Sequence, residues 1–332
     1  MNLKKQAPRF LVALLLLFSI AACQSSKQLT TIVLLPDTQT YAQKFPHILQ
    51  SQVDWILENK ADIDIVLQQG DLTQNNNREE WAVVKEAFDK LNGVVPYALA
   101  VGNHDMGSEP GKFADIRHTE MFNAFFPYHQ MSKLPAFGGV FEDGKMDNAY
   151  YLIEKAGFKW LIINLEFGPR DMVLDWANRV VRNYPDRTVI VNTHSYMYSD
   201  STRQNKGDHW RPQAYGIGKD TGASSVNDGE QIWRKLIKEN GNIRFVFSGH
   251  VLNSGVGNLV SINDDGWPVY QHLANYQAGV KGSVKGGNGF LRILKINHRT
   301  NTMSVKTYSP YTKTYKTDEG QDFIIKAMSL KQ

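Results

Sequence analysis

The chain has 332 residues, of which 42% are apolar and 21% are charged. This composition excludes a disordered chain and a collagen-like fibre. The 37 basic residues exceed the 33 acidic ones by four, and there is one cysteine. A single cysteine excludes a disulfide framework and any metal site built from several thiolates. A chain of this length forms one large α/β domain or two small ones.

Residues 1–22 have the features of a secretory leader. Three basic residues precede an apolar run that is too short to span a bilayer as a helix, which takes about 20 residues. Ala21 and Ala22 directly precede Cys23, an order that resembles the bacterial lipobox. The resemblance implies cleavage before Cys23, lipid on this residue, and a tether over residues 23–29. The alternative is an ordinary signal with an incidental cysteine, which the position of the only cysteine disfavours.

The leader also accounts for most of the basic excess. Without it, the mature chain carries 34 basic and 33 acidic residues. This near-neutral balance gives no reason to expect a nucleic-acid partner. We expect contact with a membrane through the lipid anchor alone. Gln24 after the cysteine favours the outer membrane of a Gram-negative cell envelope, on either face and outside the cytoplasm. The sequence leaves the oligomeric state open.

From Thr30 onward, short apolar runs alternate with amphipathic segments. Runs rich in Val, Ile, Leu and aromatic residues predict strands, and apolar residues at helical spacing predict helices. The predicted strands of this first part are 31–35, 63–68, 95–101, 150–154, 159–164, 188–192 and 243–247. The predicted helices are 47–59, 79–91 and 228–239. This alternation predicts an α/β fold with parallel strands in its early part.

After Ser254 the pattern changes to strands without long helices. These strands are predicted at 255–262, 268–274, 290–297 and 303–308. We expect them to form an antiparallel section that completes a second sheet. Because no convincing linker is visible, residues 30–332 are expected to form a single domain.

Polar side chains follow five of the predicted strands, often beside a glycine. The segments are Asp37-Thr38-Gln39, Gly70-Asp71, Gly102-Asn103-His104-Asp105, Thr193-His194 and Gly249-His250. In open α/β sheets, ligands bind beyond the carboxyl ends of the strands. Five such ends would gather carboxylates, an amide and imidazoles in one place. The adjacent glycines are expected to permit sharp turns there.

A divalent cation would stabilise such a cluster. Clustered carboxylates repel each other, and buried imidazoles prefer to be neutral. Oxygen and imidazole ligands without thiolate suit manganese, iron or zinc. Two such ions about 3.5–4 Å apart would bind the attacking and leaving oxygens of an in-line displacement at phosphorus. The residue types therefore favour a dinuclear centre for phosphoester chemistry.

The five segments, in this order, resemble the motifs of the calcineurin-like metallophosphoesterases. The match extends from Asp37 to His250. The resemblance implies a metallo-dependent phosphatase-like fold, a four-layer α/β/β/α sandwich of two mixed sheets flanked by helices. It also implies an enzyme that hydrolyses a phosphoester with two metal ions, manganese, iron or zinc. The expected substrate is a phosphoester small molecule or a phospho-headgroup.

The resemblance further implies six metal ligands divided between two ions. They are Asp37 and Gln39 at the first ion, Asp71 between both ions, and Asn103, His194 and His250 at the second. His104 matches the histidine that contacts the phosphate and helps to protonate the leaving oxygen, and Asp105 would orient His104 through a hydrogen bond. A metal-bound hydroxide would attack phosphorus.

Two residues depart from the family pattern. Gln39 stands where many members have histidine, but its carbonyl oxygen can still bind a cation. Many members also read Gly-His-x-His, whereas Leu252 replaces the last histidine here and cannot bind one. His272 and Asn253 are candidate substitutes that the sequence does not place. Leu252 motivates an alternative function, a binding or structural lipoprotein of the cell envelope that keeps the fold, has lost turnover and holds at most one metal tightly.

Residues 195–226 lack periodicity and contain several aromatic residues, as functional loops often do. We interpret this segment as a flap with Arg203, His209 and Trp210 as candidate substrate contacts. The alternative is a variable loop with ordinary aromatic anchors. The chain has no dense arginine and lysine cluster to hold a dianionic monoester, which slightly favours a diester. Outside the motifs, His298 is expected at the surface, as are three other histidines.

Overall fold

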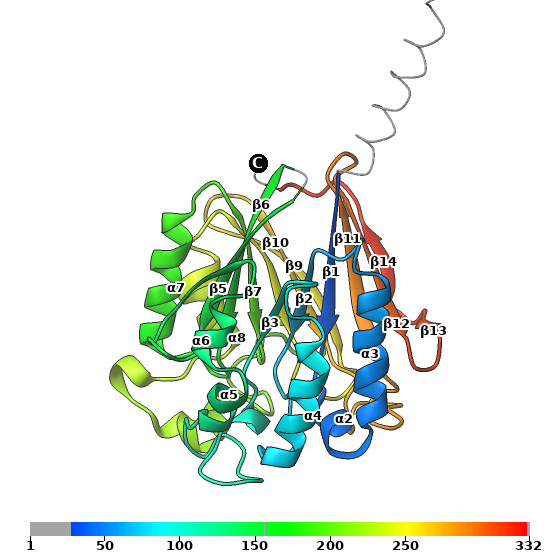
Figure 1. Cartoon of the computed structure of the whole chain (residues 1–332). Helices are drawn as coiled ribbons and strands as arrows, with labels where there is room; N and C mark the ends of the chain where they lie inside the picture. Colours follow the sequence, from blue (N-terminus) through cyan, green and yellow to red (C-terminus); the bar gives the residue numbers. More distant parts are fainter. Residues whose placement is uncertain (1–27, 156, 331–332) are drawn as a thin grey trace, which may run out of the picture.

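The computed structural model describes residues 28–155 and 157–330. Within these residues, the strands form two sheets, with α3 and α4 on one outer side and α7 on the other (Figure 1). No helix in these described segments is long and apolar enough to cross a membrane. The predictions for the leader and for Cys23 lie outside the described residues.

The first sheet has the order β13-β12-β11-β1-β2-β3, and β14 also pairs with β12. The three strands β1, β2 and β3 are parallel, whereas β11 runs antiparallel to β1. Their bounds are β1 Leu29–Leu35, β2 Ile65–Gln68, β3 Tyr97–Leu99, β11 Leu291–Asn297, β12 Thr302–Ser309, β13 Thr314–Lys316 and β14 Asp322–Ile325.

The second sheet has the order β4-β5-β6-β7-β8-β10-β9. The four strands β6, β7, β8 and β10 are parallel, and β4, β5 and β9 pair antiparallel with their neighbours. Their bounds are β4 Phe137–Val140, β5 Ala149–Lys155, β6 Phe158–Leu165, β7 Thr188–Thr193, β8 Ile243–Ser248, β9 Val256–Ile262 and β10 Pro268–Ala274.

The late strands are therefore divided differently from our prediction. We expected them to complete one antiparallel section, but β9 and β10 join the second sheet while β11 and β12 extend the first. The reason lies in β1, which is buried over six of its seven residues. A buried strand needs hydrogen-bond partners along both edges, and β11 supplies the second edge, with Ile32 opposite Leu294.

Helices cover the outer faces of both sheets. On the first sheet lie α2 (Gln39–Lys44), α3 (Pro46–Glu58) and α4 (Arg78–Asp89); the shorter α5 (Glu120–Phe125) and α6 (Tyr128–Met131) follow. On the second lie α7 (Asp171–Asn183) and α8 (Gly229–Ile232), which continues as a π-helical turn over Trp233–Ile237. The sequence did not lead us to predict α7, although its buried residues keep helical spacing.

Alternate residues of β6 show the layers. Trp160 and Ile162 pack between the sheets, whereas Leu161 and Ile163 pack with the α7 side. A strand buried on both faces in this way has a sheet on one side and helices on the other. The four-layer α/β/β/α sandwich is thus confirmed.

His298 corrects another expectation, because its side chain is buried rather than at the surface. Its ring stacks on Phe158 with centroids 3.3 Å apart, and its Nε2 lies 2.9 Å from Thr30 Oγ1. Burial lowers the pKa of His298 to about 4. The ring therefore serves as a neutral packing group between the ends of the two sheets.

Candidate metal centre

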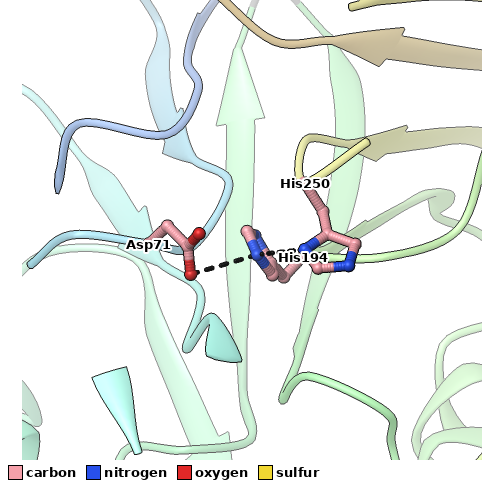
Figure 2. A group of neighbouring side chains, drawn as sticks. All are labelled: Asp71, His194 and His250. Atoms are coloured by element: carbon pink, nitrogen blue, oxygen red, sulfur yellow. Dashed lines mark hydrogen bonds and ion pairs between the residues drawn. The ribbon is translucent and has the colours of Figure 1, made fainter. Parts of the chain in front are cut away.

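The side chains that follow five parallel strands meet at one edge of the molecule. Asp37, Asp71 and Asn103 follow strands of the first sheet, and His194 and His250 follow strands of the second. Asp71, His194 and His250 are buried and each offers a ligand atom within 4.8 Å of the others (Figure 2). The site consequently lies where the two sheets face each other.

The atom at the centre of this cluster is Nε2 of His194. It lies 3.1 Å from Asp71 Oδ1, 3.1 Å from Asn103 Oδ1 and 3.0 Å from Nδ1 of His250. Around a cation with bonds of about 2.1 Å, neighbouring octahedral ligands lie about 3.0 Å apart. The spacing of these four atoms fits a single cation between them.

The hydrogens on both rings point away from the cluster. Nδ1 of His194 lies 2.8 Å from the carbonyl oxygen of Gln69, and Nε2 of His250 lies 2.7 Å from that of Trp210. A carbonyl only accepts, so each of these nitrogens carries the hydrogen. When neither ring carries a second proton, the facing nitrogens present lone pairs to each other, beside the carboxylate of Asp71. Such a group of acceptors is suited to a cation, so these residues fit the metal that the family implies.

The pKa values of these side chains also indicate a site that binds positive charge. Burial opposes a charge on His194, but nearby Asp71 outweighs it and raises the pKa of His194 to about 9. Burial and the neighbouring His194 lower the pKa of His250 to about 3. Burial also opposes ionisation of Asp71, but His194 and His104 outweigh it and hold the pKa of this carboxyl below its usual range. The site thus attracts positive charge.

A second group of acceptors lies on the other side of Asp71. Its Oδ2 accepts a hydrogen bond of 3.2 Å from Gln39 Nε2 and so points away from His194. The Asp37 carboxylate accepts from the backbone N–H of His250 at 3.0 Å and 3.2 Å. Gln39 Oε1 is buried and has no hydrogen-bond partner among the described residues. A carboxylate with one oxygen toward each group is suited to bridge two ions.

The backbone at this edge is strained. Asp37, Asp71 and His250 have φ angles of 44°, 52° and 71°, in a region that non-glycine residues rarely adopt. We expected the neighbouring glycines to stand where a Cβ would collide, and this is confirmed at Gly102 and Gly249, although neither has a positive φ. A Cβ would lie 2.2 Å from Asp71 Oδ1 at Gly102 and 2.1 Å from Asp37 Oδ2 at Gly249.

His104 lies at the edge of the cluster, with its Nε2 3.9 Å from Asp71 Oδ2. Its Nδ1 lies 2.7 Å from the carbonyl oxygen of Gln74 and therefore carries the hydrogen. The ring also packs on Phe113, with centroids 3.9 Å apart. The backbone of Gln74 and the ring of Phe113 together fix the imidazole.

Asp105 does not hold His104 as we expected. Its buried carboxylate accepts hydrogen bonds from the backbone N–H groups of Leu72, Thr73 and Gly102 at 2.9–3.0 Å. These bonds tie the loop after β2 to the loop after β3. The sequence suggested a direct contact because the two residues are adjacent, but their side chains point to different partners.

Arg203, a candidate substrate contact in the flap 195–226, is instead paired with other residues of the chain. Its Nε lies 2.6 Å from Glu230 Oε2, and a terminal nitrogen donates to Ser261 Oγ at 2.9 Å. Its guanidinium lies 4.4 Å from the centre of the Trp233 ring. The charge of Arg203 is thus neutralised at the outer face of the second sheet.

Other flap residues do reach the centre. Trp210 does so through its backbone oxygen, which accepts from His250, while the neighbouring side chain of His209 is exposed. Tyr215 packs with its ring 5.1 Å from that of Phe167 and 6.2 Å from that of His250. Burial, and then the nearby Asp71, raises the pKa of Tyr215. The flap therefore packs against one side of the cluster.

Neither candidate substitute for the missing histidine reaches the described cluster. Nδ1 of His272 lies 2.6 Å from Asn258 Oδ1, with its ring beside Phe247 in the core. Asn253 is exposed and donates to Ser199 Oγ.

A different residue, Gln277, lies beside the group that the resemblance assigns to the first ion. Its Nε2 is 3.1 Å from Asp37 Oδ1. Gln277 follows β10, which runs parallel to β8. Ligands bind beyond the carboxyl ends of parallel strands, so a prediction that β10 is parallel would have identified Gln277 as a candidate.

The comparisons with known proteins agree with this geometry. The model of the calcineurin-like phosphoesterase family matches residues 30–254. The chain belongs to this family. The predicted family is thereby confirmed. This family depends on a dinuclear metal centre, and the chain has a buried Asp/His/His cluster.

Individual relatives cover the chain more fully than it covers them. The chain is 29% identical over 305 residues to the uncharacterized protein YvnB of Bacillus subtilis (strain 168). The aligned region covers 88% of this chain and 21% of YvnB. The chain also resembles purple acid phosphatase PPD1 from yellow lupin seeds, with a TM-score of 0.52, 14% identity, and coverage of 90% of this chain and 54% of that one. The 5'-nucleotidase precursor of Thermus thermophilus aligns with a TM-score of 0.47 and 13% identity, over 90% of this chain and 55% of that one. The chain thus spans about a fifth of the curated relative and about half of each solved structure.

Proposed function

We propose that the protein is a metal-dependent phosphoester hydrolase that acts outside the cytoplasm, with a slight preference for diesters. The observation that carries this proposal is the convergence of three acceptor atoms at 3.0–3.1 Å around a fourth, His194 Nε2, with the outer hydrogens of both rings donated to backbone carbonyls. When bound, two metal ions would supply a nucleophile from water and withdraw charge from the phosphoryl group.

The residues of the chain would divide the work as their positions suggest. Asp37 and Gln39 would hold the first ion, and Asp71 would bind both ions. The second ion would be held by Asn103, His194 and His250. The Asp71 carboxylate supports this assignment, since its two oxygens point to different groups.

His104 would give a proton to the leaving oxygen from Nε2. The carbonyl of Gln74 fixes the ring so that this nitrogen faces the site. Asp105 would act on catalysis only through the loops that it ties together. His209 and Trp210 are the proposed substrate contacts of the flap.

The preference for a diester rests on charge. Both arginines of the flap are paired with carboxylates, Arg203 with Glu230 at 2.6 Å and Arg211 with Asp228 at 3.7 Å. A dianionic monoester would gain little from such neutralised groups, whereas a monoanionic diester requires less compensating charge.

We also propose the cell envelope as the location, with the protein held at the outer membrane by lipid on Cys23 and with residues 30–332 as one domain. The order Ala-Ala-Cys after an apolar run supports the anchor. Attachment by two or more acyl chains would be stable without a spanning helix.

The test of the reaction is the hydrolysis of bis-p-nitrophenyl phosphate and p-nitrophenyl phosphate after separate addition of manganese, iron and zinc. We expect metal-dependent turnover, faster with the diester, and its loss in Asp71→Asn. Inactivity with all three metals would favour the binding lipoprotein, which predicts one tightly held metal and no effect of His104→Ala. Unchanged turnover in Asp71→Asn would refute the proposed centre.

A further inference from the structure

Gln277 is held in place beside the second group of acceptors, around Asp37 and Gln39. Its side-chain nitrogen lies 3.1 Å from Asp37 Oδ1 and 3.4 Å from the backbone oxygen of His250. Its side-chain oxygen accepts a hydrogen bond from Gln39 Nε2. Gln277 therefore touches both side chains that the family pattern assigns to the first ion alone.

The backbone around Gln277 is fixed by a buried asparagine. The N–H of Gln277 donates to Asn275 Oδ1 at 3.0 Å, and Asn275 Nδ2 donates to the backbone oxygen of Val251. This second bond joins the loop after β10 to the loop after β8, which carries His250. A side chain on such a braced loop is preorganised for binding.

Leu252 supports the same loop. A Cβ added to Gly279 would lie 3.2 Å from Leu252 Cδ1, so this leucine packs against the segment that carries Gln277. The chain thus has an apolar side chain at the position of the family histidine, and this side chain packs against the segment that brings an amide to the site.

The two amides can present oxygen to a cation. Amide nitrogen and oxygen occupy equivalent positions, so a half-turn of the terminal group exchanges them without moving the rest of the side chain. Gln39 already has a buried oxygen without a partner among the described residues. Two amide oxygens and two carboxylates would then surround the first ion.

We propose that Gln277 is a protein ligand of the first metal ion and replaces the histidine missing at Leu252. The first ion would then have only oxygen ligands, Asp37, Gln39, Asp71 and Gln277, while the second keeps two imidazoles. Oxygen ligands suit manganese, whereas imidazoles suit zinc and iron. The proposal rests on the proposed metal centre and adds that its two sites differ in their metal preference.

The test measures metal binding in the full-length protein, without an activity assay. Protein stripped with a chelator is titrated with Mn²⁺ by calorimetry, and bound metal is counted by elemental analysis. We expect two Mn²⁺ per wild-type chain. In Gln277→Ala one of the two Mn²⁺ should bind about 10- to 100-fold less tightly, the loss seen when support of a metal site is removed. The spin coupling of a manganese pair in electron paramagnetic resonance should disappear with it.

Two further variants sharpen the result. Gln277→Glu keeps an oxygen and adds a charge, so it should bind both Mn²⁺ at least as tightly as the wild type. Gln50→Ala removes a glutamine from helix α3, where it contacts Lys90 instead of the cluster, and should behave as the wild type. Because Gln277→Glu retains a side chain of the same size, it tests the proposal even if the alanine variant does not fold.

The outcomes separate this proposal from the broader one. Two Mn²⁺ bound with unchanged affinity in Gln277→Ala, or weaker binding of either Mn²⁺ in Gln277→Glu, would overturn the role of Gln277 and leave the metal centre intact. Absence of any bound metal in the wild type would overturn both. Zn²⁺ should displace the Mn²⁺ of the second site first, and the reverse order would contradict the difference between the sites.

Discussion

The position of one hydrogen on each of two rings determines what can bind beside Asp71. The carbonyl oxygens of Gln69 and Trp210 fix these hydrogens on the outer nitrogens of His194 and His250. Backbone carbonyls are strict acceptors, so this choice does not depend on neighbouring side chains. The backbone carbonyls of Gln69 and Trp210, which do not face the site, therefore set which ring nitrogens face it.

His104→Ala should lower kcat by about 10²- to 10⁴-fold, the usual contribution of a positioned acid or base. The reason is that Nε2, the free nitrogen of this ring, would no longer supply a proton to the leaving oxygen. The loss should be larger for an alkyl diester than for a p-nitrophenyl one, because an alkoxide is the poorer leaving group. Kinetics with both substrates checks this difference.

Bound metal is the control for this variant. His104 lies outside the group of four acceptor atoms, so two metal ions should remain in His104→Ala. Equal losses with both leaving groups would contradict the assignment of His104 as an acid.

Among the elements, the start of α4 supports His104 from a distance. Glu80, in the first turn of this helix, accepts hydrogen bonds from the backbone N–H groups of Gln74 and Asn75 at 2.8 Å and 2.7 Å. Asn77 caps the helix by accepting from the N–H of Glu80 at 2.9 Å. The loop that presents the carbonyl of Gln74 to His104 is thus built onto the helix.

Glu80→Ala should destabilise the fold by about 1.5–3 kcal/mol, because hydrogen bonds to a charged group are lost. It should also lower kcat, since the carbonyl of Gln74 would no longer fix His104. Urea denaturation and steady-state kinetics measure the two effects. Glu79→Ala, an exposed neighbour on α4, is the matched control and should change neither. Full activity of a destabilised Glu80→Ala would show that the support is structural only.

The direction of β10 is an element-scale feature that the sequence did not indicate. Its apolar run was predicted, but not that it lies parallel to β8. A short strand carries no local sign of its direction, because direction depends on which neighbour it pairs with. This parallel pairing places Gln277 at the metal edge.

At the scale of the whole molecule, the two sheets are joined beneath the site. Asn192 Nδ2 donates to the backbone oxygen of Gln68 on β2 at 2.9 Å and to Asn164 Oδ1 at 2.6 Å. Asn164 in turn donates to the backbone oxygen of Leu99 on β3. These buried amides fix the sheets at the level where their strand ends must meet.

Removal of metal should therefore lower the stability of the entire fold. A ligand that binds only the folded state stabilises it by about 2.7 kcal/mol at a concentration of about 100 times its Kd. We expect the thermal midpoint to fall on addition of a chelator and to recover with Mn²⁺. His194→Ala should show little of this difference. A midpoint that is the same with and without chelator would argue against a metal centre in the folded protein.

The proposed anchor predicts how the protein partitions. Wild-type protein from cells should enter the detergent phase, whereas Cys23→Ala should remain in the aqueous phase, because the acyl chains that hold it are absent. Phase separation followed by immunoblotting measures this. Asp71→Asn is the control and should partition as the wild type. Detergent partitioning of Cys23→Ala would refute lipid attachment at this residue.

The sequence alone determined the family, the strand ends and the residues that follow them, because these depend on local patterns of apolar and polar side chains. Tertiary structure decided the rest. Arg203 is neutralised by Glu230, His298 is buried on Phe158, and Gln277 approaches Asp37 from 240 positions away. Each of these contacts depends on which strands lie side by side, a long-range property that no short segment encodes.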